Sequence, residues 1–241
     1  MMPRPVKNKK ELRAVTFDLY NTLLIGGPAD NDTDISAQVF SNALHLDGME
    51  MDEDSAAEMF ATQFDRSKKD GFTYFERRIA TFLDSHDFQV PDTSIQQYAQ
   101  AIIQSWGPRW TLADDAIDVI SVLKQNGIAV GLVTNFDHYP YVRELLTKWE
   151  LDSLLDAIVI SFEVRSDKPA PEIFLHALSS LRVAPEEALH VGDDIVDVEG
   201  ALDVGMQALQ IDHTGAVGSK GHVVGVPVIR TLSELTEHIL L

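Results

Sequence analysis

Short apolar runs alternate with helical patterns along most of the chain. The runs are continuously hydrophobic and bounded by turn residues, which is typical of parallel strands covered on both faces. We therefore expect strands at 15–17, 128–133, 157–160, 189–191, 207–211 and 226–229. Helical periodicity fills the intervals, over 113–125, 140–149, 171–181, 197–204 and 233–240. This alternation predicts an α/β fold with a doubly wound parallel sheet.

Residues 26–108 interrupt the alternation. They carry helical patterns at 34–46, 52–68, 74–85 and 93–106, with no convincing strand between them. Consecutive helices of this length bury their apolar stripes best against one another, as a small helical bundle. Gly26-Gly27-Pro28 and Gly107-Pro108 are typical of hinges at the two ends. We expect an α/β core of residues 1–25 and 109–241, with a helical cap domain inserted at 26–108.

The amino-acid composition argues against several classes of binding partner and of functional site. The chain has 38 acidic and 19 basic residues and a net charge of -19, which repels nucleic acid and anionic lipid. With no cysteine, disulfides, thiolate metal sites and cysteine nucleophiles are excluded. No apolar segment suits a signal peptide or a membrane span. We expect a cytoplasmic protein that binds neither nucleic acid nor membrane; its oligomeric state leaves no sequence signal.

Polar side chains follow the predicted strands in four places. They are Asp18, the pair Thr134 and Asn135, Lys168, and the group Asp193, Asp194 and Asp197. In doubly wound sheets, sites form where loops converge beyond the carboxyl ends of the strands. An aspartate there can attack phosphorus or carbon and form a covalent intermediate. Hydroxyl, backbone N–H and ammonium donors can stabilise the charge on a transferring phosphoryl group.

The carboxylates indicate a metal. Asp193 and Asp197 share one face if a helix begins there. Beside Asp18, each carboxylate pair would repel by roughly 4 kcal/mol at an effective dielectric near 20. A hard cation relieves this repulsion, and oxygen ligands with open positions suit Mg²⁺. We expect Mg²⁺ as the cofactor.

The order and spacing of these motifs, together with the inserted cap, resemble the haloacid dehalogenase superfamily over the whole chain. The resemblance implies a Rossmann-like hydrolase with Asp18 as nucleophile. It implies that Thr134, Asn135 and Lys168 bind the substrate, with Thr134 and Lys168 also catalytic. Its metal ligands would be Asp18, the main-chain carbonyl of Tyr20, Asp193, Asp194 and Asp197. Asp193 would ligate Mg²⁺ directly, and Asp194 would hold a water on it.

Tyr20 departs from the pattern of the family's phosphatases. Those enzymes usually carry a second aspartate at this catalytic position, as general acid and base for the leaving group. Tyrosine has a pKa of about 10 and accepts protons poorly. Because general acid–base help is typically worth on the order of 10²–10⁴-fold, ordinary phosphate monoesters should turn over slowly. Substrates with good leaving groups, such as acyl phosphates, would depend on it less.

Tyr20 also leaves alternative functions open. The superfamily's 2-haloacid dehalogenases carry tyrosine there, work without metal through an aspartyl ester, and lack this acidic fourth motif. We favour a Mg²⁺-dependent phosphatase that acts on a small phosphorylated metabolite through an aspartyl-phosphate, because carboxylates clustered without a cation are unfavourable. A metal-independent dehalogenase and a non-catalytic binding protein of the same fold remain alternatives.

Several other polar residues have structural interpretations. We expect His190 to be a core histidine and His138 a solvated residue at a helix start. We expect a largely solvated basic face in the cap, from which one residue could still select an anionic substrate. This face comprises Arg66, Lys68, Lys69, Arg77 and Arg78. The cap carries no motif that identifies the substrate.

Overall fold

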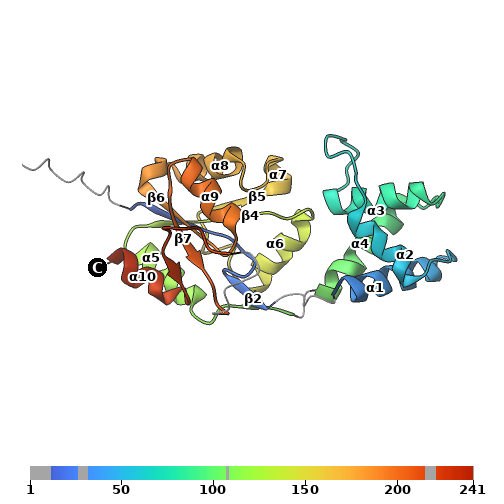
Figure 1. The fold of residues 1–241 in the computed structure, drawn as a ribbon, viewed down its shortest axis with the longest axis horizontal. Coiled ribbons are helices and arrows are strands. Elements are labelled where there is room, and N and C mark those ends of the chain that lie inside the picture. Colours follow the sequence, from blue (N-terminus) through green and yellow to red (C-terminus); the bar gives the residue numbers. More distant parts are fainter. Residues whose placement is uncertain (1–11, 27–31, 107–108, 215–220, 241) are drawn as a thin grey trace, which may run out of the picture. The chain divides into compact units, whose positions relative to one another are not determined.

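The computed structural model describes residues 12–26, 32–106, 109–214 and 221–240 (Figure 1). The predicted hinge residues Gly27, Pro28, Gly107 and Pro108 lie outside these ranges. The chain forms two compact units. The first, the core unit, contains the described residues up to Leu23, Ala113–Asn135 and those from Glu150 onward; the second, the helical unit, contains 24–112 and Phe136–Trp149. The predicted boundaries at 25/26 and 108/109 stay a prediction.

The core unit contains a six-stranded parallel sheet in the order β5-β4-β1-β6-β7-β8. The strands are β1 (Ala14–Phe17), β4 (Ala129–Thr134), β5 (Ala157–Ile160), β6 (Ala188–Gly192), β7 (Gln207–Ile211) and β8 (Val228–Ile229). Every residue of β1 and β6 is buried, as the unbroken apolar runs predict. The predicted doubly wound parallel sheet is confirmed.

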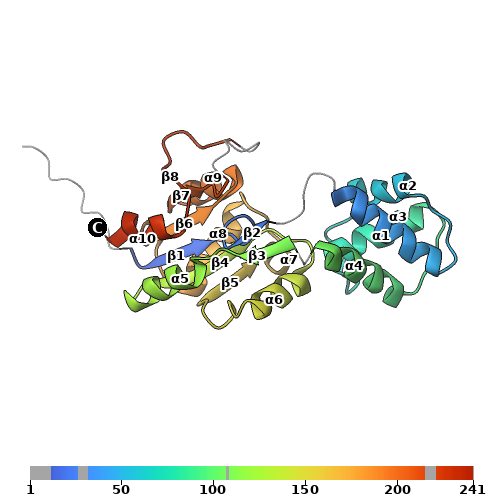
Figure 2. The same cartoon turned by 90° about the horizontal axis from the view of Figure 1, so that it is seen from below.

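Helices cover both faces of this sheet (Figure 1 and Figure 2). Helices α8 (Pro171–Leu181) and α9 (Ile195–Asp203) pack on one face, and α5 (Ala116–Gln125) and α10 (Ser233–Leu240) cover the other. Shorter helical turns occur at α7 (Ser161–Val164) and Pro185–Glu187. Pro171 stands in the first turn of α8, where its missing N–H has no helical partner to lose. Ile173 and Phe174 of α8 pack with Val133 and Val198 in the core.

The register of β1 brings three loops together. Strand β1 lies between β4 and β6, and Phe17 is paired with both Leu132 and Val191. All three strands are parallel, so their carboxyl ends meet at one edge of the sheet. Asp18, the end of β4 and Gly192 are therefore neighbours at that edge, which is where this fold class forms its sites.

The helical unit contains the helices of the insertion and one helix from further along the chain, α6. Its elements are β2 (Leu24–Gly26), α1 (Asp32–Leu46), α2 (Glu53–Ala57), the 3-10 turn Glu58–Ala61, α3 (Tyr74–Ser85), α4 (Asp92–Trp106), β3 (Trp110–Leu112) and α6 (Tyr139–Lys148). Helix α1 packs against α2 and α4, and α3 packs against α4. The ring of Phe40 meets those of Phe82 and Tyr98 at 5.9 Å between centroids. Strands β2 and β3 pair antiparallel and were not predicted.

The helix predicted at 52–68 is wrong in its second half. The helical backbone ends at Ala61, and Thr62 is extended, with a ψ of 125°. Beyond it, the Asp65 carboxylate accepts the Ser67 N–H at 2.8 Å, and that of Asp70 accepts the Phe72 N–H at 3.1 Å. Such side-chain-to-backbone bonds compete with a helix, so residues 62–73 form a loop with helix-like composition.

Two polar residues expected in solvent are buried in the helical unit. Arg77 is 4 % exposed, and two of its N–H groups donate to the Asp70 carboxylate, at 2.7 and 3.2 Å. His138 is 6 % exposed, and its Nε2 lies 3.7 Å from Oε1 of Glu76. The hydrogen bond from Arg77 lowers the pKa of Asp70 to about 2. The basic residues of 66–78 are therefore not one solvated face.

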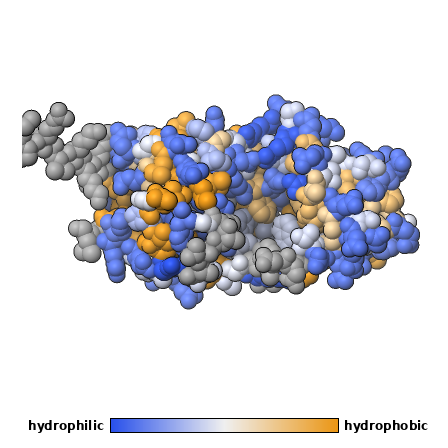
Figure 3. All heavy atoms as spheres, in the orientation of Figure 1, coloured by the Kyte–Doolittle hydropathy of each residue, from blue (hydrophilic) through white to orange (hydrophobic). Residues whose placement is uncertain are grey.

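Surface properties agree with a strongly charged chain. The face drawn in Figure 3 is mostly hydrophilic, with separate hydrophobic patches. Among the described residues, every helix is too short or too polar to traverse a lipid bilayer.

Replacing Asp70 with Asn should lower the free energy of unfolding of the helical unit by about 1 kcal/mol at pH 7, a value reduced by solvent screening. The folded pKa lies below the unfolded value of about 4, so this stabilisation is complete above pH 4. It should fade as the pH falls toward 2. Urea denaturation at pH 7 and pH 3 measures it. Lys68→Gln is the control, because Lys68 is 65 % exposed and lies 3.5 Å from the same carboxylate; an equal loss in this control would contradict the assignment to Arg77.

Candidate active site

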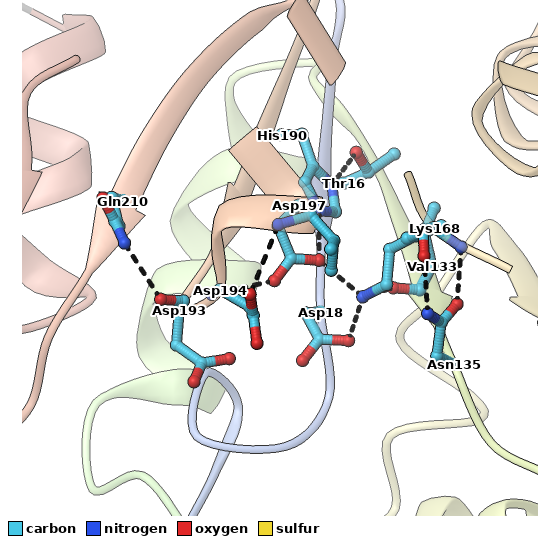
Figure 4. Close-up of polar contacts among 11 residues, drawn as sticks. Thr16, Asp18, Val133, Asn135, Lys168, His190, Asp193, Asp194, Asp197 and Gln210 are labelled. Carbon is cyan, nitrogen blue, oxygen red and sulfur yellow. Dashed lines mark hydrogen bonds and ion pairs between the residues drawn. The ribbon is translucent and has the colours of Figure 1, made fainter. Parts of the chain in front are cut away.

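Three carboxylates from separate strand and helix ends meet at the carboxyl edge of the sheet (Figure 4). Asp18 follows β1, Asp193 follows β6, and Asp197 lies in the first turn of α9. One oxygen from each lies within 4.8 Å of the others. Asp18 and Asp197 are buried and Asp193 is half-buried. Such a group is unfavourable unless a cation or protons compensate the charge.

Lys168 supplies part of that compensation. Its Nζ lies 2.5 Å from Oδ1 of Asp18 and 2.5 Å from Oδ1 of Asp197, and it donates to the Val133 carbonyl at 3.0 Å. Burial opposes the charged ammonium, but the two carboxylates outweigh it and raise the pKa of Lys168 above its ordinary value. The side chain is therefore a buried cation that joins the segment after β1, the strand β4 and the first turn of α9.

The carboxylates differ in how readily they hold a proton. Burial raises the pKa of Asp18 to about 7, although Lys168 acts against it. Burial also disfavours charge on Asp197, but Lys168 and His190 hold the pKa of that carboxyl below its usual range. Near neutral pH, Asp18 therefore carries a proton in a fraction of the molecules. A divalent cation beside Asp18 and Asp193 would take the place of that proton, so these residues fit a Mg²⁺ site.

Asn135 and Thr134 occupy different places at the end of β4. The Asn135 amide donates to the Lys168 carbonyl at 3.0 Å, and its oxygen accepts the Lys168 N–H at 2.8 Å. The side chain of Asn135 therefore fixes the lysine loop. Thr134 is fully buried, and its Oγ1 has no hydrogen-bond partner within the described ranges. That hydroxyl is available for a substrate oxygen.

The acidic motif after β6 divides into two roles. Asp194 caps α9, because its carboxylate accepts the Val196 N–H at 3.3 Å while Asp197 Oδ2 accepts the Asp194 N–H at 3.1 Å. Asp194 is outside the group of three carboxylates. Asp197 is also engaged, with one oxygen at Lys168 and the other at this cap. Asp18 and Asp193 are left as the carboxylates best placed for a cation.

Three further residues position the acidic motif. Gln210 of β7 donates to the Asp193 carbonyl at 3.1 Å. A Cβ on Gly192 would lie 2.4 Å from the Asp197 side chain, so only glycine allows that approach. His190 is buried as predicted, with Nδ1 2.8 Å from Thr16 Oγ1 and Nε2 3.4 Å from Asp197. Burial lowers the pKa of His190, and its neutral ring can donate from Nε2 to the carboxylate.

Gly192 belongs to the acidic motif that the sequence predicted, but Gln210 and His190 were assigned no function from the sequence. A glutamine inside the apolar run 207–211 and a histidine inside 188–192 are the signals that could have identified them. Tyr20, two residues after Asp18, is half-buried, and its hydroxyl oxygen is buried. The catalytic and metal-binding roles assigned to Tyr20 and to the motif residues stay predictions.

Replacing Lys168 with Met should lower the free energy of unfolding by about 3 kcal/mol, because it leaves buried carboxylates without their cation. Lys124→Met is the matched control. Lys124 lies 2.7 Å from Asp156, but the two side chains are 36 % and 40 % exposed, so the cost should stay below about 1 kcal/mol. Urea denaturation at pH 7.5 without divalent cations compares them. Equal losses in the two variants would contradict a buried ion cluster.

Comparison with known proteins places the chain in a family. The model of the haloacid dehalogenase-like hydrolases matches residues 12–205. A ribulose-1,5-bisphosphate 5-phosphatase of Halopiger xanaduensis is 26 % identical over 209 residues, which are 83 % of this chain and 84 % of that relative. Human N-acylneuraminate-9-phosphatase is 32 % identical over 127 residues, which are 52 % of this chain and 50 % of that one.

A crystal structure of a HAD phosphatase from Thermococcus onnurineus has a similar fold. It superposes with a TM-score of 0.64 at 24 % identity, and the match covers 95 % of this chain and 98 % of that one. Because the family match spans more than half of the chain, the protein belongs to the haloacid dehalogenase-like hydrolases.

Proposed function

We propose that the protein is a Mg²⁺-dependent phosphatase that hydrolyses a small phosphorylated metabolite through an aspartyl-phosphate on Asp18. The observation that carries this proposal is the position of Asp18, which shares one buried cluster with Asp193 and with the ammonium of Lys168. The two relatives named above are called phosphatases, which supports phosphate esters as the substrate class.

The reaction would proceed in two displacements. A carboxylate oxygen of Asp18 attacks the phosphorus, an O–P bond forms, and the bond from phosphorus to the ester oxygen breaks. That oxygen leaves with the electron pair and takes a proton from solvent or a nearby donor. Water then attacks the same phosphorus and gives up a proton to solvent, the bond to Asp18 breaks, and inorganic phosphate leaves with the carboxylate restored.

The surrounding residues would hold the phosphoryl group. Lys168 is a fixed cation beside the nucleophile, and the hydroxyl of Thr134 can donate to a phosphoryl oxygen. Asn135 keeps the lysine loop in place. When bound, Mg²⁺ would supply positive charge to the phosphoryl oxygens. Asp18, Asp193 and the main-chain carbonyl of Tyr20 would hold it, with Asp194 and Asp197 close by in the sequence motif.

Tyr20 favours a second candidate, a metal-independent 2-haloacid dehalogenase. Asp18 would then attack carbon and displace halide, which needs no proton from a general acid. Halide release from 2-haloacids in the presence of EDTA would support it. A third candidate is a binding protein that retains the fold; Mg²⁺ binding without turnover across phosphate esters and haloacids would support that one.

The Asp18→Asn variant should lose turnover of aryl phosphates by at least about 10³-fold, because the amide is no nucleophile. Asp203→Asn, at an exposed position of α9, is the control and should keep wild-type activity. EDTA should remove the wild-type activity and added Mg²⁺ should restore it. Steady-state rates with an aryl phosphate measure all three effects; undiminished activity of Asp18→Asn would exclude Asp18 as nucleophile.

Replacing Tyr20 with Asp should raise turnover of alkyl phosphates, whose leaving groups need a proton, by about 10²-fold. Acyl phosphates should gain much less. Tyr20→Phe removes the hydroxyl without adding a carboxyl, and it should show no such gain. The rates of both variants on the two substrate classes measure the effect. No change with Tyr20→Asp would mean that this position does not face the leaving group.

A further inference from the structure

A second polar site lies entirely within the helical unit. It is a half-open pocket of about 190 Å³, lined mainly by Phe60, Gln63, Phe64, Arg66, Arg78 and Asp137. A water occupies roughly 30 Å³ of liquid volume, so the pocket has room for a carboxylate or phosphate group with a few attached carbons. None of its residues belongs to the Asp18 cluster.

The charged side chains of this pocket carry one more positive than negative charge. Asp137 Oδ1 lies 3.4 Å from Arg66 Nη2, and its Oδ2 lies 2.8 Å from Arg78 Nη2. A single carboxylate thus contacts two guanidinium groups. The net charge of the whole chain is -19, so a positive pocket is a local exception that would concentrate small anions.

Aromatic rings hold the two guanidinium groups in place. The Arg66 guanidinium lies 4.4 Å from the centre of the Tyr74 ring, and that of Arg78 lies 5.2 Å from the centre of the Phe64 ring. Stacking of this kind orders arginine without using its N–H groups. Arg78 keeps donating capacity, because its Nη1 reaches only the Phe60 carbonyl, at 3.5 Å. Within the described residues, Arg78 Nε has no partner.

The sequence shows the same concentration of charge. All Lys and Arg residues of 32–106 fall within 66–78, while acidic residues occur from Asp32 to Asp92. Arg77 is accounted for by its pair with Asp70. Arg66 and Arg78 are the two that line the pocket.

We propose that this pocket binds the carboxylate or phosphate group of a small molecule. Arginine presents several N–H donors in one plane, which match the oxygens of either group. The proposal concerns this pocket alone and does not depend on the reaction at Asp18.

Malonate is a suitable probe for the pocket itself. Isothermal titration into the full-length chain, without divalent cations, should show binding. Arg66→Gln and Arg78→Gln should each raise Kd by about tenfold, the effect expected for losing one charged hydrogen bond. Lys69→Gln removes the same charge from an exposed position outside the pocket, and its Kd should stay within about twofold of wild type.

The titration decides the proposal. Loss of affinity in both arginine variants but not in Lys69→Gln supports it. No binding to the wild-type chain, or one Kd shared by all four proteins, overturns it. Arg66 is 46 % exposed, so Arg66→Gln should fold even if Arg78→Gln is unstable, and thermal denaturation of each variant checks this.

Discussion

The ammonium of Lys168 is the contact on which the candidate site depends. It lies between the carboxylates of Asp18 and Asp197 and is bonded to the carbonyl that precedes Thr134. Asp18 and Lys168 are 150 residues apart in the chain, and they meet because β4, whose end holds the lysine segment, lies beside β1. Buried charges of one sign persist only when an opposite charge is fixed among them. The order of the strands therefore brings the buried carboxylates together, and the lysine compensates their charge.

The contact with Lys168 also helps to distinguish the structural roles of the acidic residues. Asp197 is occupied by Lys168, by His190 and by the N–H of Asp194. Asp194 caps a helix. Asp18 and Asp193 have no such second role in capping α9, and with Asp197 they form the group of carboxylates that could hold a metal ion. Burial raises the pKa of Asp18 to about 7, and the neighbouring carboxylates of Asp197 and Asp193 act in the same direction.

Features set by local pattern could be predicted from the sequence, and features set by distant partners could not. Continuous apolar runs located the sheet, and helix α8 has the predicted bounds, 171–181, because Pro171 marks its start. Strands β2 and β3 are three residues long and pair across the whole insertion, so neither carries a periodic signal. Hydropathy placed Arg77 and His138 in solvent, but Asp70 and Glu76 compensate their burial. Gln210 contacts Asp193 only through the folded sheet.

The carboxylate cluster at Asp18 and the pocket lined by Arg66 and Arg78 have side chains with opposite excess charge. Around Asp18, three carboxylates lie together and one ammonium contacts two of them, so negative charge is in excess. In the helical unit, two guanidinium groups share the carboxylate of Asp137, so the charged side chains that line that pocket carry an excess of positive charge. In both places a single group of opposite sign, Lys168 or Asp137, holds the like-charged groups in position without neutralising all of them. With a net charge of -19, the chain as a whole repels anionic ligands, so fixed cations such as these are what would attract an anion locally.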